Sequence, residues 1–223
     1  WLQTTFDWQG SFYGFALMAA GMLIHAFCIL PSKSSSPHRA PVSILGTLKA
    51  VARNRDFLRY WWIAALVFAC YFALISVTPL IFMDSLKLSE YQYALVLMVY
   101  GVAYLLGGVV ASYLQKRISL PRQINIGLGL LSVSGVLLAL IIHYEAITTL
   151  TLLIPMLISA LAVTLVRPAA MSAAMLLFSS SAGTAASAGN SIMFLTAAVS
   201  SAALAQTGDH LLMTIALSFI GLS

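Results

Sequence analysis

The sequence predicts an all-α transmembrane protein, and three observations support that prediction. Of the 223 residues, 61% are hydrophobic and only 8% are charged, whereas soluble domains carry about 25% charged residues. The mean hydropathy is +0.98. The apolar residues gather into seven stretches, at residues 11–31, 60–83, 93–114, 124–142, 147–178, 184–205 and 211–223. Too few charges remain to cover a water-soluble fold, which argues against most soluble enzymes and any free nucleic-acid-binding protein.

The lengths of the stretches predict how many of them cross the bilayer. A spanning helix needs about 20 residues, and the first four stretches and the sixth have that length. The fifth, 147–178, is too short for two spans and predicts one long helix that Pro155 and Pro168 kink. The seventh, 211–223, covers roughly 19 Å as a helix and is interpreted as a truncated span. We therefore expect about seven hydrophobic helices.

The segment between the first two spans has a different composition. Residues 32–42 form a polar linker broken by Pro37 and Pro41. Apolar residues then recur at helical spacing, at Ile44, Leu45, Leu48, Val51 and Ala52, with Lys49 and Arg53 on the other side. This pattern predicts a short amphipathic helix at the cytoplasmic membrane surface, the alternative being a solvated connector with one or two helical turns. The expected division is a first span (1–31), a cytoplasmic linker (32–57) and a six-helix domain (58–223).

The distribution of charge predicts the orientation. Residues 32–59 and 116–122 hold nine of the eleven basic residues, which are Lys33, Arg39, Lys49, Arg53, Arg55, Arg59, Lys116, Arg117 and Arg122. Five of the six acidic residues fall in the segments on the opposite side, at Asp7, Asp84, Glu90, Glu145 and Asp209. Because short cytoplasmic loops are enriched in Lys and Arg, the first helix is predicted to run from outside to inside.

Reactive residues are sparse. Cys28 and Cys70 lie inside apolar stretches and are predicted to be buried free thiols. No nucleophile triad, phosphate loop, metal cluster or dinucleotide fingerprint is present in the sequence, so we expect neither an enzyme nor a cofactor or metal. The chain begins at Trp1 and stops at Ser223 inside an apolar stretch, which we interpret as a piece of a longer protein.

The order of one helix, a basic linker and six helices resembles a major facilitator superfamily transporter from its sixth helix onward. Leu48–Tyr60 is similar to the linker that leads into helix seven of the Bcr/CflA (bicyclomycin-resistance) drug:proton antiporters. Ser76–Leu80 with Leu86–Ser89 resembles that family's seventh helix and outer loop, and Ala182–Ala188 its connection between helices ten and eleven. Asp7–Phe12 looks like its outer loop before helix six.

The resemblance implies a fold and an activity. The fold is a partial major facilitator superfamily fold in a multi-pass protein of the bacterial inner membrane. The activity is export of small amphipathic drugs in exchange for protons, by alternating access. The implied partners are the drug, protons, the lipid bilayer and an amino-terminal half of the same polypeptide, and we expect a monomer that binds no nucleic acid. Two alternatives stay open, an exporter of a metabolite or sugar derivative and a membrane scaffold that transports nothing.

Candidate substrate-binding residues follow from helix faces. The resemblance implies that 60–83 and 147–178 face the substrate cavity, and Tyr71, Leu74 and Thr78 share one face of the first of these. Thr164 and Arg167 share a face of the second with Ala160 and Met171. Arg167 either extends its side chain to the cytoplasmic interface or faces the cavity and pairs with substrate or with an acid of the absent half.

Further candidates lie on the third and sixth stretches. Tyr100 and Tyr104 share a face and either line the cavity or pack between helices, whereas Tyr91 and Tyr93 belong to the interfacial aromatic belt. Asn190 and Phe194 are expected cavity contacts. The predicted substrate-binding set is therefore Tyr71, Leu74, Thr78, Tyr100, Tyr104, Thr164, Arg167, Asn190 and Phe194.

Proton coupling and helix packing complete the expectations. No Asp or Glu lies in the middle of a span, so the proton carrier stays unassigned, and His25 is a weak candidate that packing alone also explains. The pairs Gly183/Ser187 and Ala185/Gly189 have the small-xxx-small spacing, which favours close helix packing over a binding role.

Overall fold

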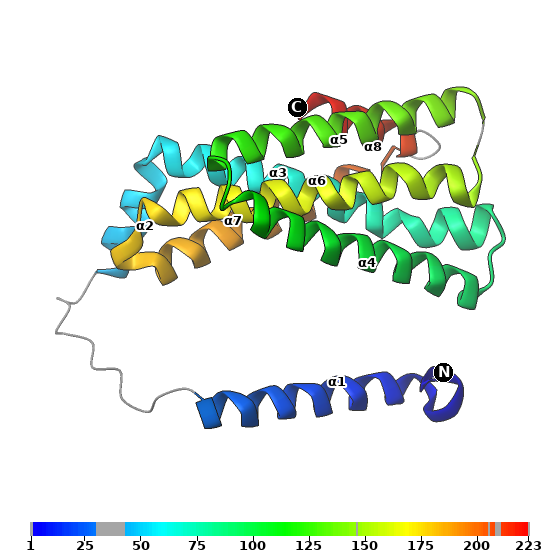
Figure 1. Cartoon of the computed structure of the whole chain (residues 1–223), viewed down its shortest axis with the longest axis horizontal. Helices are drawn as coiled ribbons and strands as arrows, with labels where there is room; N and C mark the ends of the chain where they lie inside the picture. Colours follow the sequence, from blue (N-terminus) through cyan, green and yellow to red (C-terminus); the bar gives the residue numbers. More distant parts are fainter. Residues whose placement is uncertain (1, 30–42, 146, 205, 208–210, 223) are drawn as a thin grey trace. The chain divides into compact units, whose positions relative to one another are not determined.

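The computed structural model describes residues 2–29, 43–145, 147–204, 206–207 and 211–222, and within them it contains helices and no strands. Among the described residues, six helices are long and apolar enough to cross a membrane and a seventh apolar helix, the last, is shorter, which confirms the predicted all-α transmembrane class. The elements in chain order are α1 (Leu2–Ile29), α2 (Ile44–Arg53), α3 (Arg55–Pro79), the π-helical turn η1 (Leu80–Ser85), α4 (Glu90–Leu114), α5 (Leu120–His143), α6 (Thr149–Leu176), the 3₁₀ turn η2 (Ser179–Ser181), α7 (Ala182–Leu204) and α8 (Leu211–Gly221) (Figure 1).

The chain divides into two compact units, Trp1–Pro41 and Val42–Ser223. The first contains α1, and the second contains the helices from α2 to α8. Both cysteines are free, as expected, and Cys70 is buried, but Cys28 is exposed on α1. The expected burial of Cys28 was therefore wrong, because among the described residues of its unit α1 has no second helix to pack against. The predicted linker at 32–42 lies outside the described residues.

The predicted amphipathic helix is confirmed as α2, and it leads almost directly into α3. The Asn54 backbone N–H donates to Ala50 O (3.0 Å), ending α2, while its side-chain Oδ1 accepts from the Phe57 N–H (2.9 Å), beginning α3. The cap explains why α3 starts at Arg55 rather than at residue 60, where the apolar stretch begins. Val51 of α2 packs beside Phe57, whereas the other apolar side chains of the helix stay exposed. The expected place of α2 at the cytoplasmic membrane surface stays a prediction.

Pro79 changes the helix geometry at the other end of α3. Proline lacks an N–H and so cannot donate the usual helical hydrogen bond to the carbonyl of Ile75, four residues earlier. That carbonyl accepts a hydrogen bond from the Thr78 hydroxyl instead (2.8 Å). A hydroxyl has one proton, so Tyr93 is the donor in its 2.8 Å hydrogen bond with Thr78 Oγ1. The chain then continues as η1. The predicted single span at 60–83 is thus an α-helix followed by a π-helical turn.

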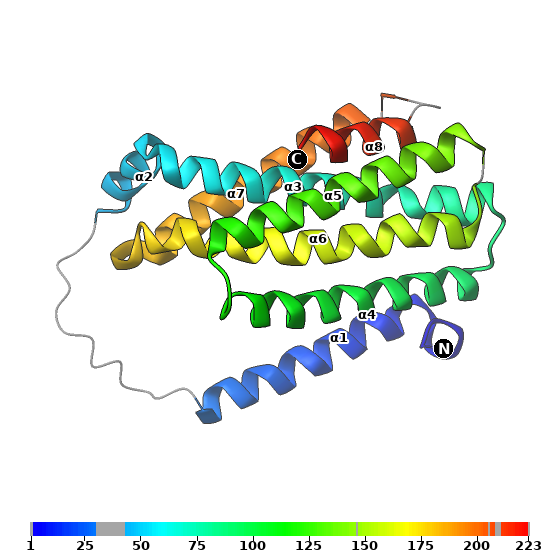
Figure 2. The ribbon, with the colours of Figure 1, turned by 45° about the horizontal axis from the view of Figure 1, so that its top comes forward.

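Helix α6 is the centre of the second unit, where it contacts α3, α4 and α5 (Figure 2). It continues through Pro155 and Pro168, which confirms the predicted single long helix, while the kinks expected at the two prolines stay a prediction. Two buried hydrogen bonds tie it to α5, from Ser134 Oγ to Pro155 O (2.7 Å) and from Gln123 Nε2 to Leu165 O (3.0 Å). Inside a membrane the lipid tails are as apolar as the helices, so no hydrophobic force drives the helices together. Hydrogen bonds between helices therefore help to set their relative positions.

Helix α7 packs on α3 through one of the two small-residue pairs. Ala185 and Gly189 are buried, and a Cβ on Gly189 would overlap the indole of Trp61. Gly183 and Ser187 are exposed instead. The packing role predicted for the run therefore belongs, within this unit, to Ala185 and Gly189.

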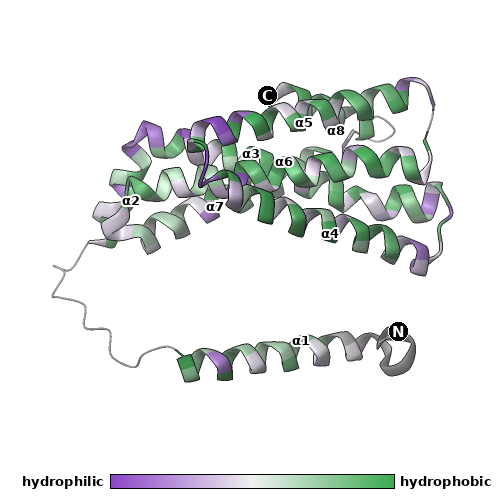
Figure 3. Cartoon of the chain, in the orientation of Figure 1, coloured by the Kyte–Doolittle hydropathy of each residue, from purple (hydrophilic) through white to green (hydrophobic). Residues whose placement is uncertain are grey.

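Polar residues gather at the two ends of the helices, and apolar residues cover their length (Figure 3). Ser119 and Ser85 are both exposed, at the start of α5 and the end of η1. In a Cys28→Ala/Cys70→Ala background, a cysteine at Ser119 should react with an impermeant maleimide only after cells are permeabilised, while one at Ser85 should react in intact cells. The reverse labelling would overturn the predicted orientation.

Candidate functional site

An aromatic cluster forms where α3 meets α4. Phe68 and Tyr71 lie on one face of α3, with ring centroids 6.4 Å apart. The Tyr71 ring stacks on Tyr100 of α4 (6.1 Å, 19° between planes) and meets Tyr104 at 5.8 Å. Offset stacking at these distances is the favoured geometry for aromatic pairs. Tyr71 thus joins the two tyrosines that the sequence placed on one helix face.

Phe68 connects this cluster to two more helices. Phe194 of α7 meets the Phe68 ring edge-on, with centroids 5.8 Å apart and an interplanar angle of 87°. The guanidinium carbon of Arg167, on α6, lies 4.7 Å from the centroid of the same ring. From its position on α3, Phe68 therefore contacts residues of both α6 and α7. We call Phe68, Tyr71, Tyr100, Tyr104 and Phe194 the aromatic cluster.

The members of the cluster differ in accessibility. Tyr100 is 3% exposed, and its hydroxyl makes no hydrogen bond of good geometry within the described residues, although Ser159 and Tyr71 are close enough to interact with it. Tyr71 and Tyr104 are half-buried, and Phe194 is 62% exposed. Phe68 is half-buried as well, so within this unit the surface of the cluster comes from Phe68, Tyr71, Tyr104 and Phe194, while the buried Tyr100 ring stacks on Tyr71.

Arg167 lies well inside the predicted membrane-spanning region. Its half-buried side chain rests on Phe68, which is roughly 20 Å along α3 from Arg55 at 1.5 Å per residue. The guanidinium thus points into the cluster rather than toward the helix end, which fits the cavity-facing alternative. Pro168 follows Arg167 directly and has no N–H to donate to the carbonyl of Thr164. The Thr164 carbonyl, about one helical turn before Arg167, therefore lacks its usual backbone donor.

The other predicted residues take packing positions or lie apart. Leu74 and Thr78 are buried in the core, and Thr78 is engaged by Ile75 and Tyr93. Thr164 is also buried; its hydroxyl donates to the carbonyls of its own helix, and its side chain packs on Gly107. Asn190 is half-buried one turn before Phe194. His25 is an exposed residue of the other unit.

Phe68 is the member that the sequence analysis missed. It precedes Tyr71 by three residues, so the helical spacing that grouped Tyr71 with Leu74 and Thr78 also placed Phe68 on that face. That spacing was the available signal. Without the tertiary contacts, however, nothing distinguished Phe68 from the other phenylalanines in an apolar span.

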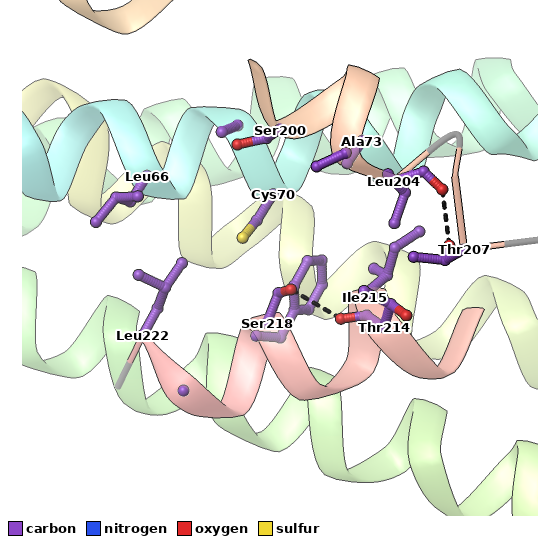
Figure 4. Close-up of a pocket in the computed structure, with 14 residues that line it drawn as sticks. Leu66, Cys70, Ala73, Ser200, Leu204, Thr207, Thr214, Ile215, Ser218 and Leu222 are labelled. Carbon is purple, nitrogen blue, oxygen red and sulfur yellow. Dashed lines mark hydrogen bonds between the residues drawn. The ribbon is translucent and has the colours of Figure 1, made fainter. Parts of the chain in front are cut away.

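A separate cavity of about 450 Å³ lies between α3, α7 and α8 (Figure 4). Its lining is apolar apart from the Cys70 thiol and several hydroxyls, and the hydroxyls of Thr207 and Ser218 donate to carbonyls of their own segments at 2.7 Å. The cavity shares no lining residue with the aromatic cluster. We place the candidate site at the cluster, because there, among the described residues, a charge and several rings from four helices lie together.

Two comparisons identify relatives of the chain. A family model described as Major Facilitator Superfamily matches residues 1–201. Among individual proteins, the chain is similar to the chloramphenicol resistance protein CraA of Acinetobacter baumannii, with 28% identity over 151 residues. That alignment covers 67% of this chain and 37% of the relative, so the chain spans well under two thirds of the relative's length.

Proposed function

Because this chain belongs to the major facilitator superfamily, we propose that it is the carboxy-terminal part of a drug:proton antiporter of the bacterial inner membrane. Transporters with two internally repeated halves bind substrate near the bilayer midplane, where the halves meet. The aromatic cluster is the observation that carries the proposal, since rings from the three helices α3, α4 and α7, with Arg167 of α6 beside them, offer stacking surface to a flat organic molecule.

The name of the relative supports an antibiotic as one substrate. That relative is a chloramphenicol resistance protein, and chloramphenicol is therefore the first compound to test. In the proposed cycle the two halves alternate access around the bound drug. The described spans hold no midspan carboxylate, so we assign proton coupling to the amino-terminal half. The Bcr/CflA subtype and a monomeric state belong to the same proposal.

Transport by the complete polypeptide tests the proposal. Reconstituted in proteoliposomes with a pH gradient, the complete protein should move chloramphenicol against its concentration gradient and should release protons on drug addition. Residues 1–223 alone, reconstituted identically, should do neither. A complete protein that moves a sugar derivative but no aromatic drug would favour the metabolite exporter, and proton release from residues 1–223 alone would contradict the assignment of coupling.

A further inference from the structure

The cation in the aromatic cluster limits what the site can accept. A guanidinium stays charged at physiological pH, and Arg167 is half-buried at the depth of Phe68. The described acidic residues of the second unit, Asp56, Asp84, Glu90 and Glu145, all lie at helix ends or in loops. None of them is in position to neutralise Arg167. A charge held inside a membrane is costly without a partner, so a partner must come from elsewhere.

The way Arg167 packs leaves its hydrogen-bonding edge available. Its guanidinium carbon lies 4.7 Å from the Phe68 ring centroid, within the range of a cation–π contact, and no described residue accepts a hydrogen bond from it. The N–H donors of a guanidinium lie in its plane and form a fork that matches two oxygens on one atom. Phe68 in turn is held by the edge-on Phe194 ring and by Tyr71. The charged group is thereby positioned beside the aromatic surface.

We propose that Arg167 and Phe68 form a subsite for a carboxylate or nitro group attached to an aromatic ring, and that this half of the site disfavours organic cations. The inference rests on the proposed function and names its substrate class. The ring of such a substrate stacks on Tyr71 and Tyr104 while its two oxygens accept from the guanidinium. An organic cation of the same shape would place its positive charge beside the Arg167 guanidinium. The repulsion between the two like charges would disfavour binding of the cation.

Matched ligands test this subsite directly. Affinities of 2-naphthoate, 2-nitronaphthalene and 2-naphthylmethylammonium for the purified complete transporter would be measured by calorimetry. Wild type should bind the carboxylate at least 10-fold more tightly than the ammonium compound, with the nitro compound between them. Arg167→Met and Arg167→Gln should reduce that ratio to about one or invert it. Arg122→Met, which removes an exposed charge at the start of α5, should leave the ratio unchanged.

The ratio of affinities separates this inference from the proposed function. A wild-type preference for the ammonium compound would overturn the subsite, since an acid of the other half would then neutralise Arg167. If Arg167→Gln still preferred the carboxylate, the subsite would also be overturned, whereas the proposed function in drug transport would not be affected. Absence of binding by every aromatic compound, in protein that remains folded, would remove the proposed site and the subsite together.

Discussion

Replacing Tyr71 and Tyr104 together with alanine is expected to weaken binding of an aromatic drug to the complete transporter by about 5- to 140-fold. These are the half-buried tyrosines of the cluster. Each stacking contact is worth about 0.5–1.5 kcal/mol beyond area burial, and 1.4 kcal/mol is tenfold in affinity. The loss should differ between drugs with different ring shapes. Direct binding of three unrelated aromatic drugs to wild type and variant measures it.

Two further variants control this result. Tyr91→Ala removes a ring that is 74% exposed and outside the cluster, so all three affinities should stay near wild type. Tyr100→Phe keeps the buried ring that supports Tyr71 and removes only the hydroxyl, so a small change is expected. Unchanged affinities in Tyr71→Ala/Tyr104→Ala would exclude these rings from the site. A uniform loss that follows reduced expression would indicate packing instead.

Gly189→Ala is expected to destabilise the packing of α7 on α3 by about 1–3 kcal/mol, the usual cost of overpacking a core. The new Cβ would overlap the indole of Trp61, which is fully buried. Trp61 has little room to move, because its ring stacks on Phe57 (5.3 Å, 8°) and Phe57 packs edge-on against Phe178 (5.3 Å). In a chain of this size the thermal midpoint should fall by roughly 2–12 °C.

Gly183→Ala provides the matched control on the same helix. A Cβ at Gly183 meets nothing within 4 Å, so the thermal midpoint should stay the same or rise slightly, since alanine favours helix over glycine. The smaller ring in Trp61→Phe should recover part of the stability lost in Gly189→Ala, which a double-mutant cycle would quantify. Equal midpoints for Gly189→Ala and Gly183→Ala would show that α7 does not pack on Trp61 in this way.

The sequence alone determined the number of spans and that each is long enough to cross a bilayer, although not their bounds, since α3 begins at Arg55 rather than at residue 60. Hydrocarbon thickness imposes a minimum length of apolar residues, and the six membrane-length helices and the short α8 follow that rule. The same reasoning predicted the amphipathic helix α2, because its apolar residues recur at helical spacing. The superfamily was also recognisable from local motifs and is confirmed. The Bcr/CflA subtype stays a prediction, since neither comparison reaches that level of detail.

Only the tertiary structure decided which side chains meet. In a span that is apolar on every side, helical spacing groups residues by face but cannot say whether a face contacts protein, lipid or a cavity. Tyr71, Leu74 and Thr78 were therefore equivalent candidates in the sequence, yet of these three only Tyr71 belongs to the aromatic cluster. Phe68 also belongs to the cluster, although the sequence analysis did not predict it. Arg167 lies over the Phe68 ring because α6 packs against α3. Local sequence fixes a helix and its length, whereas contacts between helices depend on how distant segments pack.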